Sequence, residues 1–149
     1  MPEEPFDEVH EAGLRLLARR EHSSKELRLK LMKRGYEAAL IERALEALRA
    51  ENALNDARFA EEFIRARRRQ GYGPVRIRAE LNERGVESAL AEPYLEEGDE
   101  AWDELAAEQW RKRFGSPPRN MNERAKQYRF LSNRGFTAEQ IRRAIEARG

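Results

Sequence analysis

The side chains in this sequence that are capable of acid-base or nucleophilic chemistry are few and scattered. The chain has no cysteine and only two histidines, His10 and His22. His22 precedes Ser23, but adjacent residues at a helix start point in different directions, and no third group is placed to orient the ring. Helix capping or a surface contact is the simpler interpretation. We therefore expect no catalytic residue and no enzyme activity.

Metal and nucleotide sites are not predicted either. Neither histidine has a second ligand at zinc-binding spacing, and the sequence holds no G-x-x-x-x-G-K-[ST] loop. The acidic run from Glu92 to Glu104 lacks the glycine and the alternating ligands of a calcium loop. We interpret this run as a solvated linker that is also able to shield a basic face or touch a basic partner. We expect no metal and no cofactor.

The best functional candidates are arginines. Residues 63–86 carry seven arginines and only two glutamates. On the helix expected here, three of these arginines share a solvent-facing stripe at i, i+3 and i+4, and two more follow a short break. The five are Arg65, Arg68, Arg69, Arg76 and Arg78. Such a patch would bind phosphates through counterion release or meet an acidic protein groove, and a plain solvated helix face is the alternative.

One aromatic residue lies in the same basic segment. Tyr72 is flanked by Gly71 and Gly73, whereas most other rings fall at predicted core positions. Proteins that bind single strands without sequence preference combine a basic groove with several exposed rings. One ring is weak support for that function, and packing inside the protein is the alternative.

A sequence repeat positions all of these residues. The segment Leu31-Met32-Lys33-Arg34-Gly35-Tyr36 returns 50 residues later as Leu81-Asn82-Glu83-Arg84-Gly85-Val86, and again as Leu131-Ser132-Asn133-Arg134-Gly135-Phe136. Units this small bury a core by stacking on their neighbours, which produces an elongated binding surface rather than a catalytic pocket. Contact with a partner is therefore a more plausible function than chemistry.

Composition and periodicity predict an all-α protein of three tandem three-helix repeats. Ala, Leu, Glu, Arg and Lys dominate, and no segment alternates with period two. The predicted repeats are residues 1–53, 54–98 and 99–149. The apolar stripes expected in the first repeat are Leu14, Leu17 and Ala18, then Leu27 and Leu31, then Ile41, Ala44, Leu45 and Leu48.

Capping residues support these helices. Ser23 with Glu26, and Thr137 with Gln140, fit the capping-box pattern. Gly35 stands where a left-handed cap would end the second helix. Helix-turn-helix DNA readout is the rival interpretation of such turns, but their triple occurrence favours architecture, and no cluster of base-reading side chains accompanies them.

The remaining composition bears on location. The absence of cysteine fits a reducing compartment. The acidic start of the chain has no apolar run after it, and no stretch approaches the roughly 20 apolar residues of a membrane span. We expect a cytoplasmic protein that does not contact a membrane.

Several blocks of the sequence are similar to one family, the RecX regulators of the RecA recombinase. The matching blocks cover essentially the full chain. They are Leu16-Leu17-Ala18-Arg19-Arg20-Glu21-His22-Ser23, Leu54-Asn55-Asp56-Ala57-Arg58-Phe59-Ala60, Gly71-Tyr72-Gly73-Pro74 and Tyr128-Arg129-Phe130-Leu131 with Arg134-Gly135-Phe136.

This resemblance implies an elongated, curved repeat protein that binds the groove of a RecA filament on single-stranded DNA. It would inhibit ATP hydrolysis and strand exchange by RecA, and so limit homologous recombination and the SOS response. The resemblance implies no nucleotide or metal of its own. We expect a monomer that contacts the RecA filament and, as a second partner, single-stranded DNA. An autonomous, nonspecific DNA-binding helical module is the alternative.

The matched positions are mainly structural. Phe59 is expected in the core, Asp56 as the cap of its helix, and Arg58 in contact with a carboxylate. The expected partner contacts are the five arginines above, together with four weaker candidates on the equivalent second helices of the other repeats. These four are Lys25, Arg28, Arg124 and Lys126.

Overall fold

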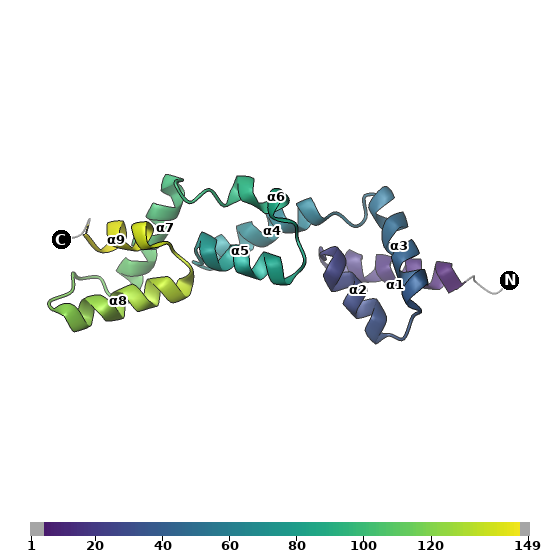
Figure 1. The fold of residues 1–149 in the computed structure, drawn as a ribbon, viewed down its shortest axis with the longest axis horizontal. Coiled ribbons are helices and arrows are strands. Elements are labelled where there is room, and N and C mark those ends of the chain that lie inside the picture. The colour runs from purple at the N-terminus through teal and green to yellow at the C-terminus, as the bar shows by residue number, and fades with distance from the viewer. Residues whose placement is uncertain (1–4, 147–149) are drawn as a thin grey trace. The chain divides into compact units, whose positions relative to one another are not determined.

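The structure, a computed structural model, describes residues 5–146 of the chain. Over this range it consists of nine α-helices and one short 3-10 helix, without a strand (Figure 1). The helices are α1 (Pro5–Arg19), α2 (Ser24–Lys33), α3 (Ala38–Ala50), α4 (Asp56–Arg69), α5 (Pro74–Glu83), α6 (Ser88–Ala91), η1 (Glu92–Tyr94), α7 (Glu100–Arg113), α8 (Met121–Arg134) and α9 (Ala138–Glu146).

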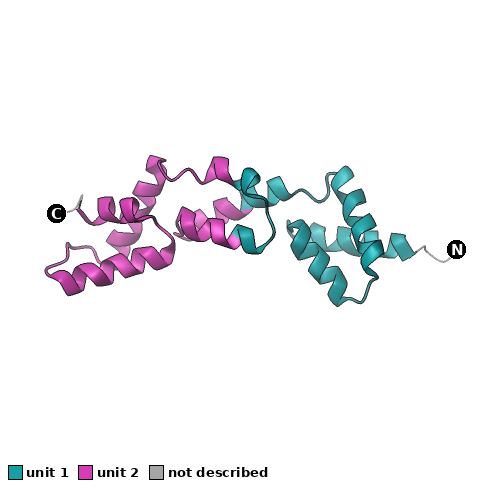
Figure 2. Cartoon of the chain, viewed as in Figure 1, with its two compact units in different colours: residues 1–62, 81–91 teal, residues 63–80, 92–149 magenta. Residues whose placement is uncertain are grey.

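The helices form three sets, α1–α3, α4–α6 and α7–α9, which confirms the predicted all-α fold of tandem three-helix repeats. The chain divides into two compact units, residues 1–62 with 81–91 (unit 1) and residues 63–80 with 92–149 (unit 2) (Figure 2). Both α4 and α5 cross this division. The middle repeat is therefore shared between the two units.

The core of unit 1 lies between α1, α2 and α3. Leu27, Leu31, Ile41 and Leu45 are fully buried, as predicted. The predicted stripe on α1 is wrong at Leu14, which is 38% exposed, and at exposed Ala18, whereas Leu17 is half-buried and packs against the core. The buried residues of α1 are Val9, Ala12, Gly13 and Leu16.

Gly13 lies on the buried face of α1, next to α3. A Cβ atom built on Gly13 would lie 2.7 Å from Leu48 Cδ1 of α3. Such a distance is shorter than real Cβ contacts, so a larger residue at this position would require the Leu48 side chain to shift. α1 therefore packs closely on α3 along the face that carries Gly13. A pattern of apolar residues alone does not reveal such a constraint.

Helix ends follow the predicted chemistry with one exception. The Ser23 Oγ accepts from Glu26 N at 3.1 Å and the Glu26 side chain accepts from Ser23 N at 3.2 Å, which confirms the capping box. The expectation that Asp56 caps α4 was wrong. Asn55 is the cap, because its Oδ1 accepts from Arg58 N at 2.9 Å, whereas the Asp56 Oδ1 accepts from Ser24 N at 2.7 Å. Asp56 thus ties the start of α4 to the start of α2.

In unit 2, α7 packs on α9 and α8 around Trp110, Leu131, Phe136 and Ile141. The core includes one polar contact, in which Trp110 Nε1 donates to the Oε1 of buried Gln127 at 2.8 Å. Burying an indole N–H without an acceptor would be costly, so this pair stabilises the unit.

The end of α8 and the start of α9 are also defined by local interactions. Thr137 and Gln140 form the second predicted capping box: Gln140 N donates to Thr137 Oγ1 at 3.1 Å, and Thr137 N donates to Gln140 Oε1 at 2.9 Å.

Among residues 5–146, no helix combines the length and the hydrophobicity needed to cross a bilayer.

Candidate interaction surface

The arginine stripe predicted on α4 is only partly a solvent-facing surface. Arg65 and Arg69 are exposed, but Arg68 is half-buried and its guanidinium carbon lies 4.3 Å from the centre of the Trp102 ring of α7. A cation over an indole face is attracted by the ring quadrupole. Arg68 therefore has a packing role that the spacing of the stripe did not predict.

Next to α4, three arginines surround one tyrosine ring. The guanidinium carbons of Arg67, Arg76 and Arg134 lie 4.6, 4.1 and 4.6 Å from the centre of the Tyr72 ring. We call Tyr72, these arginines and Glu80 the Tyr72 cluster. The ring is half-buried and engaged by internal cations, so the packing alternative describes Tyr72 better than an open stacking platform does.

Glu80 provides the negative charge in this cluster. It binds Arg67 through both carboxylate oxygens, with Arg67 Nε 2.8 Å from Oε1, and Arg76 Nε lies 3.5 Å from Oε2. Burial by itself would raise the pKa of Glu80. The hydrogen bonds and charges of Arg67 and Arg76 together outweigh that effect, and the net result is a pKa below the usual range. Glu80 therefore stays ionised at neutral pH.

The backbone beside Tyr72 is a docking point for the end of α8. Gly73 N donates to the Arg134 carbonyl at 2.8 Å, and Val75 N donates to the Gly135 carbonyl at 2.9 Å. Arg76 Nη1 donates to the Asn133 carbonyl at 3.2 Å. The unpaired N–H groups at the start of α5 thus find acceptors in the α8–α9 corner. The Gly-Tyr-Gly-Pro segment is a structural junction.

The cations predicted on the middle helices mostly have internal partners. Lys25 Nζ donates to the Glu83 carbonyl at 2.9 Å, Arg28 pairs with Glu42 at 2.6 Å, and Arg124 pairs with Glu146 at 3.4 Å. Lys126 is exposed on α8. None of these ion pairs is deeply buried, so each one costs little to exchange for a pair with a partner.

Arg78 is paired with the acidic segment. Its Nε lies 2.7 Å from Glu92 Oε1, its Nη1 lies 3.3 Å from Glu97 Oε2, and its Nη2 donates to the Leu95 carbonyl at 3.3 Å. The hydrogen bond from Arg78 lowers the pKa of Glu92. Part of the acidic run therefore shields one of the predicted contact arginines.

Unit 1 contains a comparable set of polar contacts around the start of α4. Arg58 binds both oxygens of Glu21 and donates to the Asn52 and Ala53 carbonyls at 3.1 and 3.2 Å. This arrangement confirms the expected contact between Arg58 and a carboxylate. Phe59 is buried, also as predicted.

His22 is not a surface residue, contrary to one expectation. It is 1% exposed, with Nδ1 2.9 Å from the Arg20 carbonyl and Nε2 2.8 Å from Lys30 Nζ. An ammonium group only donates, so Nε2 accepts and the Nδ1–H donates to the carbonyl, which requires the neutral ring. Burial lowers the pKa of His22, and the nearby cations Arg20 and Lys30 reinforce the effect.

Sequence reasoning missed a groove on the outer face of α8. It is a shallow, open depression of about 320 Å³ along one face of α8, lined by Met121, Arg124, Ala125, Tyr128 and Arg129. Met121 is 79% and Tyr128 40% exposed. A signal was present in the sequence, because counting in fifties aligns Tyr128 with Arg28 and Arg78. We call this site the α8 groove.

The fold and these surfaces define a class of protein. Within residues 5–146 no group of three or more His, Asp or Glu side chains is placed to hold a metal ion. The features that stand out are helical repeats, arginine-bearing faces and an exposed apolar groove. The molecule is a helical tandem-repeat protein.

Comparison with known proteins identifies the family. Models of the first, second and third three-helix domains of RecX match residues 10–48, 55–95 and 99–145. The regulatory protein RecX of Halorhodospira halophila is 44% identical over 140 residues, covering 93% of this chain and 87% of that protein. The Chromohalobacter salexigens protein is 48% identical over 133 residues, covering 89% and 88%. The chain belongs to the RecX family of regulatory proteins.

Solved structures show the same fold. RecX from Lactobacillus salivarius superposes with a TM-score of 0.81 at 23% identity, covering 96% of each chain. A second structure, of a regulatory protein RecX, also gives 0.81, at 19% identity and covering 96% of this chain and 72% of the other. At these identities the likeness concerns the fold alone.

Proposed function

We propose that this protein is a negative modulator of the RecA recombinase. It binds the RecA filament on single-stranded DNA and inhibits ATP hydrolysis and strand exchange, which limits homologous recombination and the SOS response. The observation that carries the proposal is family membership across all three repeats. In this proposal the protein acts in the cytoplasm as a monomer, without a cofactor or a catalytic site of its own.

Physical reasoning supports a contact mechanism. Candidate cations occur in every repeat, including exposed Lys25, Arg69 and Lys126. Individually weak contacts on separate repeats reinforce one another along a polymer, because each bound contact raises the effective concentration of the next. Arg28, Arg78 and Arg124 contribute by exchanging their internal carboxylates for partner groups, since exposed ion pairs are worth about 0–1 kcal/mol.

The ATPase rate of a preassembled RecA filament on single-stranded DNA tests the proposal. The protein is titrated from far below one copy per several RecA protomers upward. We expect hydrolysis to fall at substoichiometric dose, because a regulator of a polymer acts on many protomers at once. Unchanged hydrolysis at excess protein, combined with tight and steeply salt-dependent binding to naked DNA, would support the autonomous DNA-binding module instead.

A further inference from the structure

In unit 1, the corner after the middle helix of the second repeat docks on α2. Gly85 lies so close to Lys25 that a Cβ atom at Gly85 would be 2.9 Å from Lys25 Cβ. Lys25 Nζ donates to the Glu83 carbonyl at 2.9 Å, and Arg84 pairs with Glu26 at 3.6 Å. The outer face of α2 therefore packs against another segment of the same chain, the corner that follows α5.

In unit 2, the next Arg-Gly corner docks on α5 in the same way. A Cβ atom at Gly135 would lie 2.3 Å from Arg76 Cβ. Arg76 Nη1 donates to the Asn133 carbonyl at 3.2 Å, as Lys25 does to the Glu83 carbonyl in unit 1. The middle helix of a repeat is thus a protein-docking element in both units.

The corresponding face of α8 is open. Counting in fifties aligns Ala125 with Lys25 and Val75, and Ala125 lies in the α8 groove. The Tyr128 side chain makes no hydrogen bond or ring contact with any of residues 5–146, and it is 40% exposed. A large, exposed apolar contact area next to arginines marks an interaction site.

The third repeat also departs from the other two at the position of Tyr128. Arg28 pairs with Glu42 at 2.6 Å, and Arg78 pairs with Glu92 at 2.7 Å, in the same register. Fifty residues further, these positions hold Tyr128 and Arg142. Loss of the internal ion pair leaves the tyrosine ring in the groove.

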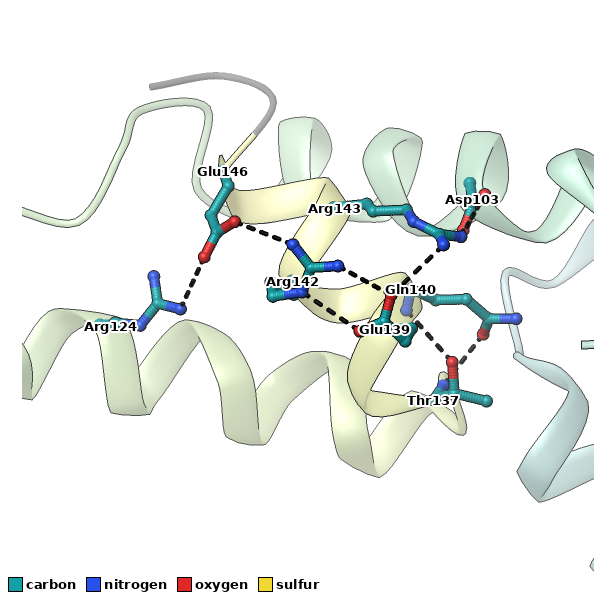
Figure 3. A network of polar contacts seen from close by, with 8 residues as sticks. All are labelled: Asp103, Arg124, Thr137, Glu139, Gln140, Arg142, Arg143 and Glu146. Carbon is teal, nitrogen blue, oxygen red and sulfur yellow. Dashed lines mark hydrogen bonds and ion pairs between the residues drawn. The ribbon is translucent and has the colours of Figure 1, made fainter. Parts of the chain in front are cut away.

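Charges around the α8 groove are mostly positive. Figure 3 shows that Arg124 reaches Glu146 of α9, at 3.4 Å, while Glu146 also contacts Arg142 at 3.3 Å. Arg129 lines the groove and Lys126 is exposed on the same helix. Glu146 is therefore shared between Arg124 and Arg142, and Arg142 also pairs with Glu139 at 2.7 Å. Arg129 and Lys126 add positive charge that complements an acidic ligand.

The side chains favour a protein segment over the other acidic ligand, a nucleic acid. Methionine, tyrosine and arginine are enriched at protein interfaces, and an exposed methionine adapts to an apolar partner. A single-strand platform stacks successive bases on several rings, whereas the α8 groove offers Tyr128 alone.

We propose that the α8 groove binds an acidic protein segment with an apolar anchor residue. The anchor packs against Met121 and Tyr128, and carboxylates of the segment pair with Arg124 and Arg129. The inference deepens the proposed function by naming a contact chemistry on the third repeat, and the RecA filament is the first place to look for such a segment.

Fluorescence anisotropy with defined probes tests this inference without RecA. The probes are a short labelled peptide with a repeating Glu-Leu-Asp unit, the same peptide with Ala for Leu, and an oligothymidylate of similar length. We expect the leucine peptide to bind more tightly than the alanine peptide. Tyr128→Ala should weaken the leucine peptide about tenfold, and Arg129→Glu should weaken both peptides.

The matched control is Tyr94→Ala, which removes a similarly exposed tyrosine, 43% accessible, in the same unit. It should leave all three probes unaffected, and circular dichroism verifies that each variant keeps its helices. Equal binding of the two peptides, retained affinity in Tyr128→Ala, or a matching loss for oligothymidylate would overturn the inference. Because RecA is absent, these outcomes do not depend on whether the protein inhibits the RecA ATPase.

Discussion

The substitution Gly73→Ala, which adds a methyl group, tests the junction between the start of α5 and the end of α8. Gly73 is buried, and a Cβ atom there would lie 2.5 Å from the Gly135 carbonyl oxygen and 2.7 Å from Phe136 Cδ1. Backbone conformation is not the issue, because Gly73 is not among the residues with positive φ. The effect of Gly73→Ala on the folded state should therefore come from steric overlap.

The size of the effect follows from these distances. A carbon and a carbonyl oxygen approach to about 3.3 Å at closest, so the two backbones must separate by roughly 0.8 Å. The hydrogen bonds from Gly73 N and Val75 N, now 2.8 and 2.9 Å, would exceed the range of a good hydrogen bond. Their loss costs about 0.5–1.5 kcal/mol each, and overpacking adds about 1–3 kcal/mol. Partial relaxation leaves an expected loss of about 2–4 kcal/mol.

Chemical and thermal unfolding of Gly73→Ala measure this loss. At roughly 2–4 °C per kcal/mol for a chain of this size, the melting temperature should fall clearly. Gly98→Ala is the matched control, because nothing lies within 4 Å of a Cβ atom at Gly98. Both variants change the unfolded chain alike. If Gly73→Ala were as stable as Gly98→Ala, the described junction would be wrong.

Four further predictions concern the core, a buried histidine and two arginines of α4. Gln127→Ala should destabilise the protein by about 1–3 kcal/mol in urea unfolding, because it leaves the buried Trp110 N–H without its acceptor; a smaller loss than for a surface Gln70→Ala control would contradict this. Burial lowers the pKa of His22, so the unfolded chain takes up the proton first, and stability should fall as the pH drops below about 6.5; His22→Gln should flatten this dependence, and an unchanged slope would argue against it. Arg69→Glu should lower inhibition of the RecA ATPase at unchanged melting temperature, and retained inhibition would remove this residue from the interface. Arg68→Ala, in contrast, should lower stability by about 0.5–1 kcal/mol through loss of its contact with Trp102.

Local signals were sufficient to predict the helices. Ser23 and Thr137 begin α2 and α9 as capping boxes, and Gly35 adopts φ +88° after α2. These features depend on interactions within a few residues, which a sequence displays directly. The repeat register likewise predicted the buried positions of α2 and α3.

Residues whose role depends on a distant neighbour were harder to predict. Gln127 is in register with the buried apolar residues Leu27 and Ile77, and the repeat pattern does not explain a polar residue at this core position. Gln127 is itself buried, because Trp110 supplies a hydrogen-bond partner. No periodicity encodes that pairing, since the two residues lie on different helices.

The candidate site also has features that the sequence predicts and features that depend on the packing of distant helices. Composition, spacing and capping are local properties, and they predict an all-helical repeat protein with arginine-rich segments. The packing of the helices is needed to show which cations have internal partners, as Arg78 does with Glu92, and which are exposed, as Arg69 is. It also placed Tyr72 among three arginines and left Tyr128 open. The physical reason is that burial and ion pairing depend on the packing of helices far apart in the chain, and charge alone does not show whether a partner is already bound.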